Sequence, residues 1–274
     1  MYPRTRFCTY NLLLGGSDES RLRKQESLLT NISPDVLALQ ECALGDEAGH
    51  TRLRLMAERL GMAIVTMARS AGNEKNFTAL LYRPSKFRVV TWRLRGIDVF
   101  HHSLIEALMR PVGASDSERD FLAFATHLSW ADGESRLREA RRLTDYGGKF
   151  PGTPGRAVLL MDSNVPDREP ESWDLVPRNL WPRYRLVNDD GTFGPADERA
   201  LRVLLGVGWT DPATLTGQGR AATVGYYYAN ETAEFRLDHI LTAGDWDVRG
   251  YRTHDTEELR TLSDHLPVTL DIRL

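Results

Sequence analysis

The hydrophobic and polar positions of this chain follow two different periods, and the balance between them changes along its length. Up to Gly61, short apolar runs alternate with segments in which an apolar residue recurs every three or four positions. The runs 6–13 and 36–41 predict strands, because they are short and bounded by polar residues. The segments 17–32 and 47–61 predict amphipathic helices, the first capped by Ser17 or Asp18 and the second ended by Gly61.

Strand-like runs predominate in the rest of the chain. They are predicted at 77–83, 87–94, 104–112, 119–128, 156–164, 235–243, 246–253 and 268–274, with one helix at 133–147. That helix should have a solvated face on which arginines alternate with acids: Arg136, Arg138, Arg141 and Arg142 with Glu134 and Glu139. Because helices separate strands early and strands follow one another later, we expect one mixed α/β domain of layered sheets over residues 1–274.

A proline-rich segment covers residues 165–200. Its five prolines and lack of a regular period predict a long ordered loop. Because it directly follows a group of polar residues at a strand end, it is a candidate specificity loop. Trp173 and Trp181 would either anchor it to the core or contact a substrate.

The composition is that of a globular protein. The 274 residues are 41% hydrophobic and 27% charged, with a net charge of −3, so a strongly basic nucleic-acid surface is not expected. No signal peptide and no run long enough to span a bilayer is visible, which favours a cytoplasmic location. Cys8 and Cys42 should be free thiols, because neighbouring strands would hold them several residues out of register.

Polar residues end or interrupt six of the apolar strands, where packing does not require them. They are Asn11, Glu41, His127, the pair Asp162 and Asn164, Asp238, and the pair Asp264 and His265. Each one alone is also consistent with a turn former, a cap or a core histidine. All of them together favour a common site at one sheet edge. Crowded carboxylates repel one another unless a cation is present, and hard oxygen ligands suit Mg²⁺ or Mn²⁺.

The same residues carry a family resemblance. The motifs are "YN" at 10–11, "LALQE" at 37–41, "THL" at 126–128, "MDSN" at 161–164, "RLDHIL" at 236–241 and "SDHLPV" at 263–268. In this order they resemble the endonuclease/exonuclease/phosphatase superfamily, which includes enzymes similar to pancreatic deoxyribonuclease. The resemblance implies a four-layer α/β sandwich, with two packed mixed β-sheets flanked by helices. It also implies hydrolysis of a phosphoester with a divalent cation.

The resemblance further implies a set of metal ligands. Glu41 resembles the principal ligand, oriented with help from Asn11. Asp264 resembles the second carboxylate near the metal, which is expected to be Mg²⁺ or Mn²⁺.

Five further residues resemble the catalytic groups of the family. Asp162 would position and deprotonate the attacking water, and Asn164 would hold that water or a phosphate oxygen. Asp238 would hydrogen-bond His265 and keep it as a cation beside the phosphate. His127 would contact the phosphate or the leaving oxygen, with a role as acid.

The sequence also departs from the family pattern. Met161 stands where the family has glycine, which should alter the floor of the site. Asn76, near Glu74, stands where the family has an acid that pairs with the histidine matching His127. His239 is expected to be structural because it alternates away from Asp238, and His101 and His102 are expected to be solvated in a loop.

The fold leaves the substrate open. A phosphodiesterase or nuclease activity is the first interpretation, and hydrolysis of a small-molecule or lipid phosphoester is the alternative. A non-catalytic binding protein of the same fold is less favoured, because it need not keep these residues. The expected partner is a phosphoester substrate, either nucleic acid or a small phosphorylated molecule, and no protein partner is inferred.

Overall fold

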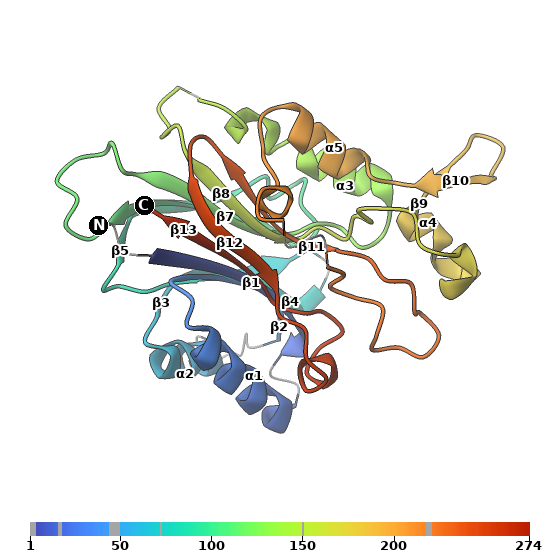
Figure 1. The fold of residues 1–274 in the computed structure, drawn as a ribbon, viewed down its shortest axis with the longest axis horizontal. Helices are drawn as coiled ribbons and strands as arrows, with labels where there is room; N and C mark the ends of the chain where they lie inside the picture. The colour runs from blue at the N-terminus through green and yellow to red at the C-terminus, as the bar shows by residue number, and fades with distance from the viewer. Residues whose placement is uncertain (1–3, 16–17, 44–49, 72, 150, 218–220) are drawn as a thin grey trace.

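The computed structural model describes residues 4–15, 18–43, 50–71, 73–149, 151–217 and 221–274. Two mixed sheets face each other in this part of the chain, and the expected α/β fold class is confirmed (Figure 1). The first has six strands in the order β12-β13-β1-β2-β4-β3: β1 (Arg4–Gly15), β2 (Val36–Cys42), β3 (Ala63–Ser70), β4 (Asn73–Tyr82), β12 (Asp247–Thr253) and β13 (Val268–Arg273). The second has five strands in the order β11-β8-β7-β6-β5: β5 (Phe87–Arg95), β6 (Leu104–Pro111), β7 (Phe121–His127), β8 (Ala157–Asp162) and β11 (Asp238–Ala243).

Helices cover the outer face of each sheet. Helices α1 and α2 lie on the six-stranded sheet, and α3 and α5 lie on the five-stranded one (Figure 1). Their bounds, with that of the short helix α4, are α1 (Glu19–Ile32), α2 (Thr51–Leu60), α3 (Gly133–Ala140), α4 (Trp181–Tyr184) and α5 (Arg199–Gly206). Asp18 caps α1 by accepting the N–H of Arg21, and Gly61 ends α2 in the left-handed conformation, as expected. Ser17 lies outside the described residues, as do positions 47–49 of the predicted second helix.

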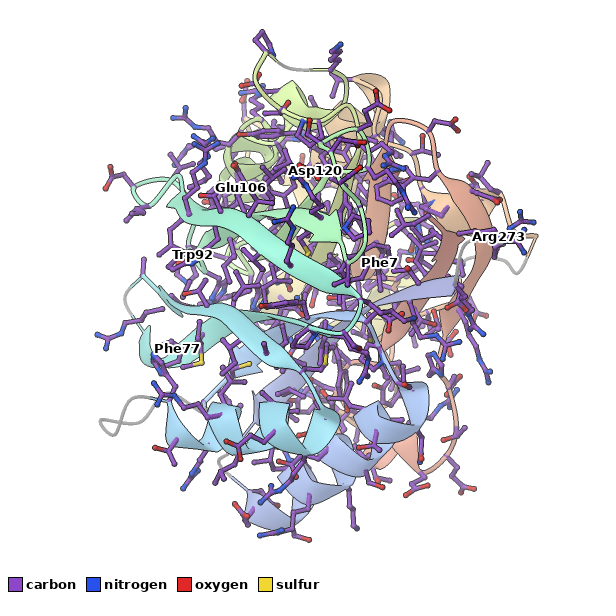
Figure 2. The ribbon with its side chains drawn as sticks, turned by 90° about the vertical axis from the view of Figure 1, so that its left-hand side faces the viewer. Phe7, Phe77, Trp92, Glu106, Asp120 and Arg273 are labelled. Carbon is purple, nitrogen blue, oxygen red and sulfur yellow. The ribbon has the colours of Figure 1, made fainter. Side chains whose placement is uncertain are left out.

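The central core lies between the two sheets. Alternate residues of each strand point into it, so that Phe7, Ala38, Ala123 and Leu160 all lie on inner faces. Phe7, labelled in Figure 2, packs edge-on against Phe121 with ring centroids 5.8 Å apart. Apolar residues at every second position thus form the middle of the sandwich, and the outer positions pack against the helices.

Several observed elements differ from the predicted ones. Strand β3, at the edge of its sheet, has no counterpart among the predicted strands, and its residues are mostly half-buried. The helix predicted over 133–147 ends at Ala140, and a 3₁₀ turn follows at Thr144–Tyr146. The segment 165–200 is not a single loop: it holds two 3₁₀ turns (Trp173–Leu175 and Arg178–Leu180), α4 and the two-stranded sheet of β9 (Arg185–Val187) and β10 (Phe193–Ala196).

The predicted solvated face of the 133–147 helix is wrong in part. Arg136 and Glu139 are each only 1% exposed. Glu139 accepts the backbone N–H groups of His101 and Ser129, both at 2.7 Å. The spacing of charged residues correctly indicates a charged face on this helix. Part of that face is buried, because backbone groups of neighbouring loops pack on it.

Both cysteines are buried and free, as predicted. Cys8 lies level with Leu37 in the parallel β1–β2 pair, so that Cys42 is several residues farther along the neighbouring strand. Burial raises the pKa of both thiols. Among the described residues, no helix combines the length and the apolar character needed to cross a bilayer.

Candidate active site

A cavity of about 550 Å³ opens where β1, β2, β7 and β8 end. Six of the eight predicted site residues line it: Glu41, His127, Asp162, Asn164, Asp264 and His265. The other two do not line the cavity but hydrogen-bond to residues that do: Asn11 to Asp162, and Asp238 to His265. Further lining residues include Asn76, Trp130, Arg183, Tyr227 and Tyr228.

Asp162 is the central residue of this arrangement. In the register of the five-stranded sheet it lies level with His127 on β7 and with Asp238 on β11. Asn11 reaches it from the opposite sheet, where its Nδ2 donates to Asp162 Oδ2 at 2.9 Å. All four side chains follow the inner-face alternation of their strands, which explains why residues far apart in sequence meet here.

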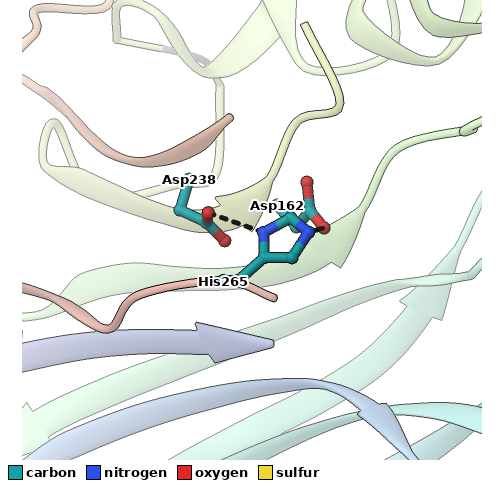
Figure 3. Close-up of side chains that lie close together, drawn as sticks. All are labelled: Asp162, Asp238 and His265. Atoms are coloured by element: carbon teal, nitrogen blue, oxygen red, sulfur yellow. Dashed lines mark hydrogen bonds and ion pairs between the residues drawn. The ribbon is translucent and has the colours of Figure 1, made fainter. Parts of the chain in front are cut away.

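Asp238 and His265 form a buried pair (Figure 3). The Nδ1 of His265 lies 2.8 Å from Asp238 Oδ2, and its Nε2 lies 3.7 Å from Asp162 Oδ2. Burial raises the pKa of Asp238, although the neighbouring His265 opposes this shift. Burial alone would lower the pKa of His265, but the carboxylates of Asp238 and Asp162 outweigh it and hold that pKa well above 6.5. The expected contact is therefore present, with the imidazole as the cation.

Asn164 connects Asp162 to His127. Its backbone N–H donates to Asp162 Oδ1 at 3.0 Å, and its Nδ2 lies 2.9 Å from His127 Nε2. The backbone of Asn164 is left-handed, with φ at 51°, a strained conformation that places both groups in the cavity wall. Burial lowers the pKa of His127 to about 3, so the ring is neutral near pH 7. A neutral ring can accept or donate a hydrogen bond. It lacks the extra proton that the imidazolium form of His127 would carry as the predicted acid.

Glu41 reaches the cavity through a break in strand alternation. Gln40 already occupies the inner face, where its Nε2 donates to Thr126 O at 3.3 Å, so regular alternation would direct Glu41 outward. The backbone of Glu41 is instead left-handed, with φ at 52°, and its carboxylate accepts the N–H of Leu14 at 3.2 Å. Burial, and then the nearby Asp264, raise the pKa of Glu41. The cavity thus contains an acidic end made by Glu41 and Asp264.

The donor set fits a divalent cation. The ligand atoms of Asp162, Asp238 and His265 lie within 4.8 Å of one another, a spacing that could hold a metal. The protonated ring of His265 is a poor ligand, however, because a histidine must lose a proton before it binds a metal. Glu41 and Asp264 offer carboxylate oxygens instead, and a cation between them would relieve the repulsion that helps to raise the pKa of Glu41.

His102 is a member of this site that sequence reasoning missed. The sequence predicts a solvated loop residue, but His102 is 1% exposed and stacks on His127, with centroids 3.9 Å apart and ring planes at 9°. Its Nδ1 lies 2.8 Å from Ser70 Oγ. The two histidines come from a loop and a strand end separated by most of β6 and β7, so no local signal indicates the contact.

The rim of the cavity also differs from expectation. Trp173 and Trp181 do not line it. They anchor their segment instead: Trp181 Nε1 donates to the carbonyls of Trp173 and Val176 at 3.2 and 3.1 Å. The exposed aromatic residues of the wall are Trp130, Tyr227 and Tyr228, at 45%, 39% and 43% exposure. The run of three tyrosines at 226–228 favours strand packing, with contact between one tyrosine and the site as the alternative, and the structure places Tyr227 and Tyr228 in the wall. Trp130 was not predicted from the sequence.

The structure places three further residues that the sequence singled out. Met161 packs in the outer core against the helices, not in the cavity floor, because strand alternation directs it away from Asp162. Asn76 lines the cavity and is buried, while the side chain of Glu74 lies outside the described residues. His239 is buried away from the cavity as expected, and its Nε2 lies 2.9 Å from the carbonyl of Arg236.

Comparison with known proteins identifies a family for this chain. The family model described as the endonuclease/exonuclease/phosphatase family matches residues 8–265. No curated protein sequence matches the chain.

Solved structures share the fold over nearly the whole chain at low identity. A family protein of Bacteroides vulgatus has a TM-score of 0.71 at 16% identity, covering 99% of each chain. The mannosyl-6-phosphatase of Bacteroides thetaiotaomicron has a TM-score of 0.67 at 18% identity, covering 98% of this chain and 100% of its own. D. rerio TDP2, solved with a single-strand DNA product, has a TM-score of 0.67 at 13% identity, covering 99% of each chain. From the family match over most of its length, we conclude that this chain belongs to the endonuclease/exonuclease/phosphatase family and is a phosphoester hydrolase.

Proposed function

We propose that this chain hydrolyses small phosphorylated molecules, as a phosphatase or phosphodiesterase that uses Mg²⁺ or Mn²⁺. The observation that carries the proposal is the charged His265 beside Asp162, in a cavity whose other end is acidic. A volume of about 550 Å³ suits a small ligand.

Each residue of the wall has a distinct part in the proposed reaction. Asp162 accepts the proton of the attacking water, held in place by the Asn11 amide and the Asn164 N–H. His265, oriented by Asp238, donates a hydrogen bond to a phosphoryl oxygen on which negative charge develops. Asn164 and His127 offer further polar contacts to the phosphate. The new P–O bond forms to the water oxygen as the P–O bond to the leaving group breaks. The leaving oxygen keeps the bonding electron pair and takes a proton from solvent to become an alcohol.

A divalent cation would be held by Glu41 and Asp264, with Asn11 helping to orient that end of the site. The ion supplies Lewis acidity toward a phosphoryl oxygen when it is bound.

The test is a hydrolysis panel with Mg²⁺, Mn²⁺ or chelator. The substrates are p-nitrophenyl phosphate, bis(p-nitrophenyl) phosphate, sugar phosphates, plasmid DNA and single-stranded DNA. Asp162→Asn should abolish turnover, whereas Asp174→Asn, an exposed aspartate outside the cavity, should behave as wild type. Folded wild-type protein that hydrolyses none of these compounds with either metal would refute the proposal.

A nuclease is the second candidate. The observation in its favour is the exposed aromatic rim of Trp130, Tyr227 and Tyr228, since aromatic side chains stack on the bases of single strands. The fold shared with D. rerio TDP2 is consistent with it. Turnover of single-stranded DNA well above that of every small phosphoester in the panel would favour this candidate.

A further inference from the structure

The cavity wall contains a second cationic side chain besides His265, that of Arg183. The guanidinium carbon of Arg183 lies 4.7 Å from the ring centroid of Trp130, and both residues line the cavity. Arg183 belongs to α4, and Trp130 follows β7, so two distant segments meet to form the pair. Among the described residues, no carboxylate forms an ion pair with the Arg183 side chain.

A second arginine holds this pair in place. Arg136 of α3 is 1% exposed, and its Nη1 donates to the carbonyl of Ser129, next to Trp130, at 3.2 Å. Its Nη2 donates to the carbonyl of Arg183 itself. One buried side chain therefore ties together the two backbone segments that carry the stacked pair. Tyr184, the next residue of α4, is fixed separately by its hydroxyl, which donates to Glu231 Oε1 at 2.9 Å.

The chemistry of this arrangement indicates an anion. A guanidinium stacked on an indole has one face shielded from water, while its N–H groups stay available at the edge. Those groups match the oxygens of a carboxylate or a phosphate in a fork geometry. In the proposed reaction the scissile phosphate has His265 as its cationic donor, and His265 lies beside Asp162 in the cavity wall.

We propose that Arg183, backed by Trp130, binds a second anionic group of the substrate, so that small phosphoesters carrying another phosphate or a carboxylate are preferred. This inference rests on the proposed function and narrows its substrate class. The cavity of about 550 Å³ has room for a sugar bisphosphate or a phosphorylated sugar acid.

The test compares three ligands at constant free metal: fructose 6-phosphate, fructose 1,6-bisphosphate and 6-phosphogluconate. Each is measured as a substrate and as a competitive inhibitor of bis(p-nitrophenyl) phosphate hydrolysis. Wild type should bind fructose 1,6-bisphosphate, 6-phosphogluconate or both about 10-fold or more tightly than fructose 6-phosphate, as expected for charge-assisted hydrogen bonds. Tighter binding of fructose 1,6-bisphosphate would indicate that Arg183 prefers a phosphate, and tighter binding of 6-phosphogluconate would indicate that it prefers a carboxylate.

Arg183→Gln should remove that preference, with a much smaller effect on bis(p-nitrophenyl) phosphate, which carries no second anionic group. Arg183→Lys should retain part of the preference. The matched control is Arg178→Gln, whose guanidinium stacks on Trp181 at 5.2 Å outside the cavity. Equal binding of the three ligands by wild type, equal losses on all ligands in Arg183→Gln, or tighter inhibition by a single-stranded oligonucleotide would each overturn the inference. Absence of any hydrolysis by wild type would instead refute the proposed function.

Discussion

The imidazole of His102 lies parallel to that of His127, with ring centroids 3.9 Å apart. Burial lowers the pKa of both rings. Repulsion from His127 lowers the pKa of His102 further, and repulsion from His265 does the same to His127. The stack therefore sets the neutral ring of His127 against a second neutral ring, while the Nε2 of His127 lies 3.2 Å from Asp162 Oδ2.

We predict that His102→Ala lowers kcat/KM by about 10-fold, because His127 loses its stacking partner and gains access to water. The pKa of His127 should rise from about 3 toward 6.5, so the acidic limb of the pH–rate profile should move to higher pH. His102→Phe keeps an aromatic ring and should retain the wild-type profile. Identical pH profiles for wild type and His102→Ala would show that the stack does not act on His127.

Asp238→Asn should lower kcat by about 100-fold while leaving the fold intact, because His265 loses the anion that orients it and favours its charge. Thermal unfolding by circular dichroism checks the fold, and steady-state kinetics measure the loss. Asp245→Asn, in the exposed turn after β11, is the matched control. A fully active Asp238→Asn variant would contradict the assigned pairing.

Chelation by EDTA should abolish hydrolysis, and Mg²⁺ or Mn²⁺ should restore it. Glu41→Ala should raise the metal concentration needed for half-maximal activity by about 10-fold or more, since a direct oxygen ligand is lost. Calorimetric titration with Mn²⁺ provides a readout that does not depend on turnover. Glu58→Ala, on the exposed side of α2, controls for loss of a surface acid. Unchanged Mn²⁺ binding in Glu41→Ala would exclude Glu41 as a ligand.

The stability of the protein should depend on pH through His239, which lies away from the cavity. Burial, and then Arg236, lower the pKa of His239 to about 3, although Asp211 and Asp167 oppose them. Its unfolded form takes up a proton near 6.5, so between these values the unfolded state binds more protons and stability falls as pH falls.

His239→Gln removes this contribution while keeping a donor for the carbonyl of Arg236. In urea titrations, the loss of unfolding free energy between about pH 7 and about pH 4.5 should be smaller in the variant by about 2 kcal/mol. Parallel pH dependences in wild type and variant would contradict the prediction.

Much of this site was determined by the sequence alone, because strand alternation and strand ends are local features. An inner-face residue recurs at every second position, so the pattern by itself directs Asn11, His127, Asp162 and Asp238 inward. Strand register brings the last three together at one sheet edge, and the packing of the two sheets brings Asn11 to Asp162. The layered fold followed from the same patterns and from the resemblance of the motifs to a family.

Tertiary structure decided the contacts that depend on the conformations of loops. The left-handed backbone that directs Glu41 into the cavity breaks the alternation on which sequence reasoning depends. His102 reaches His127, and Arg136 joins Arg183 to Trp130, across segments that share no local pattern. Loop conformations depend on packing and on hydrogen bonds to buried polar groups. The residues that make these contacts are far apart in the sequence, so a short stretch of sequence does not reveal them.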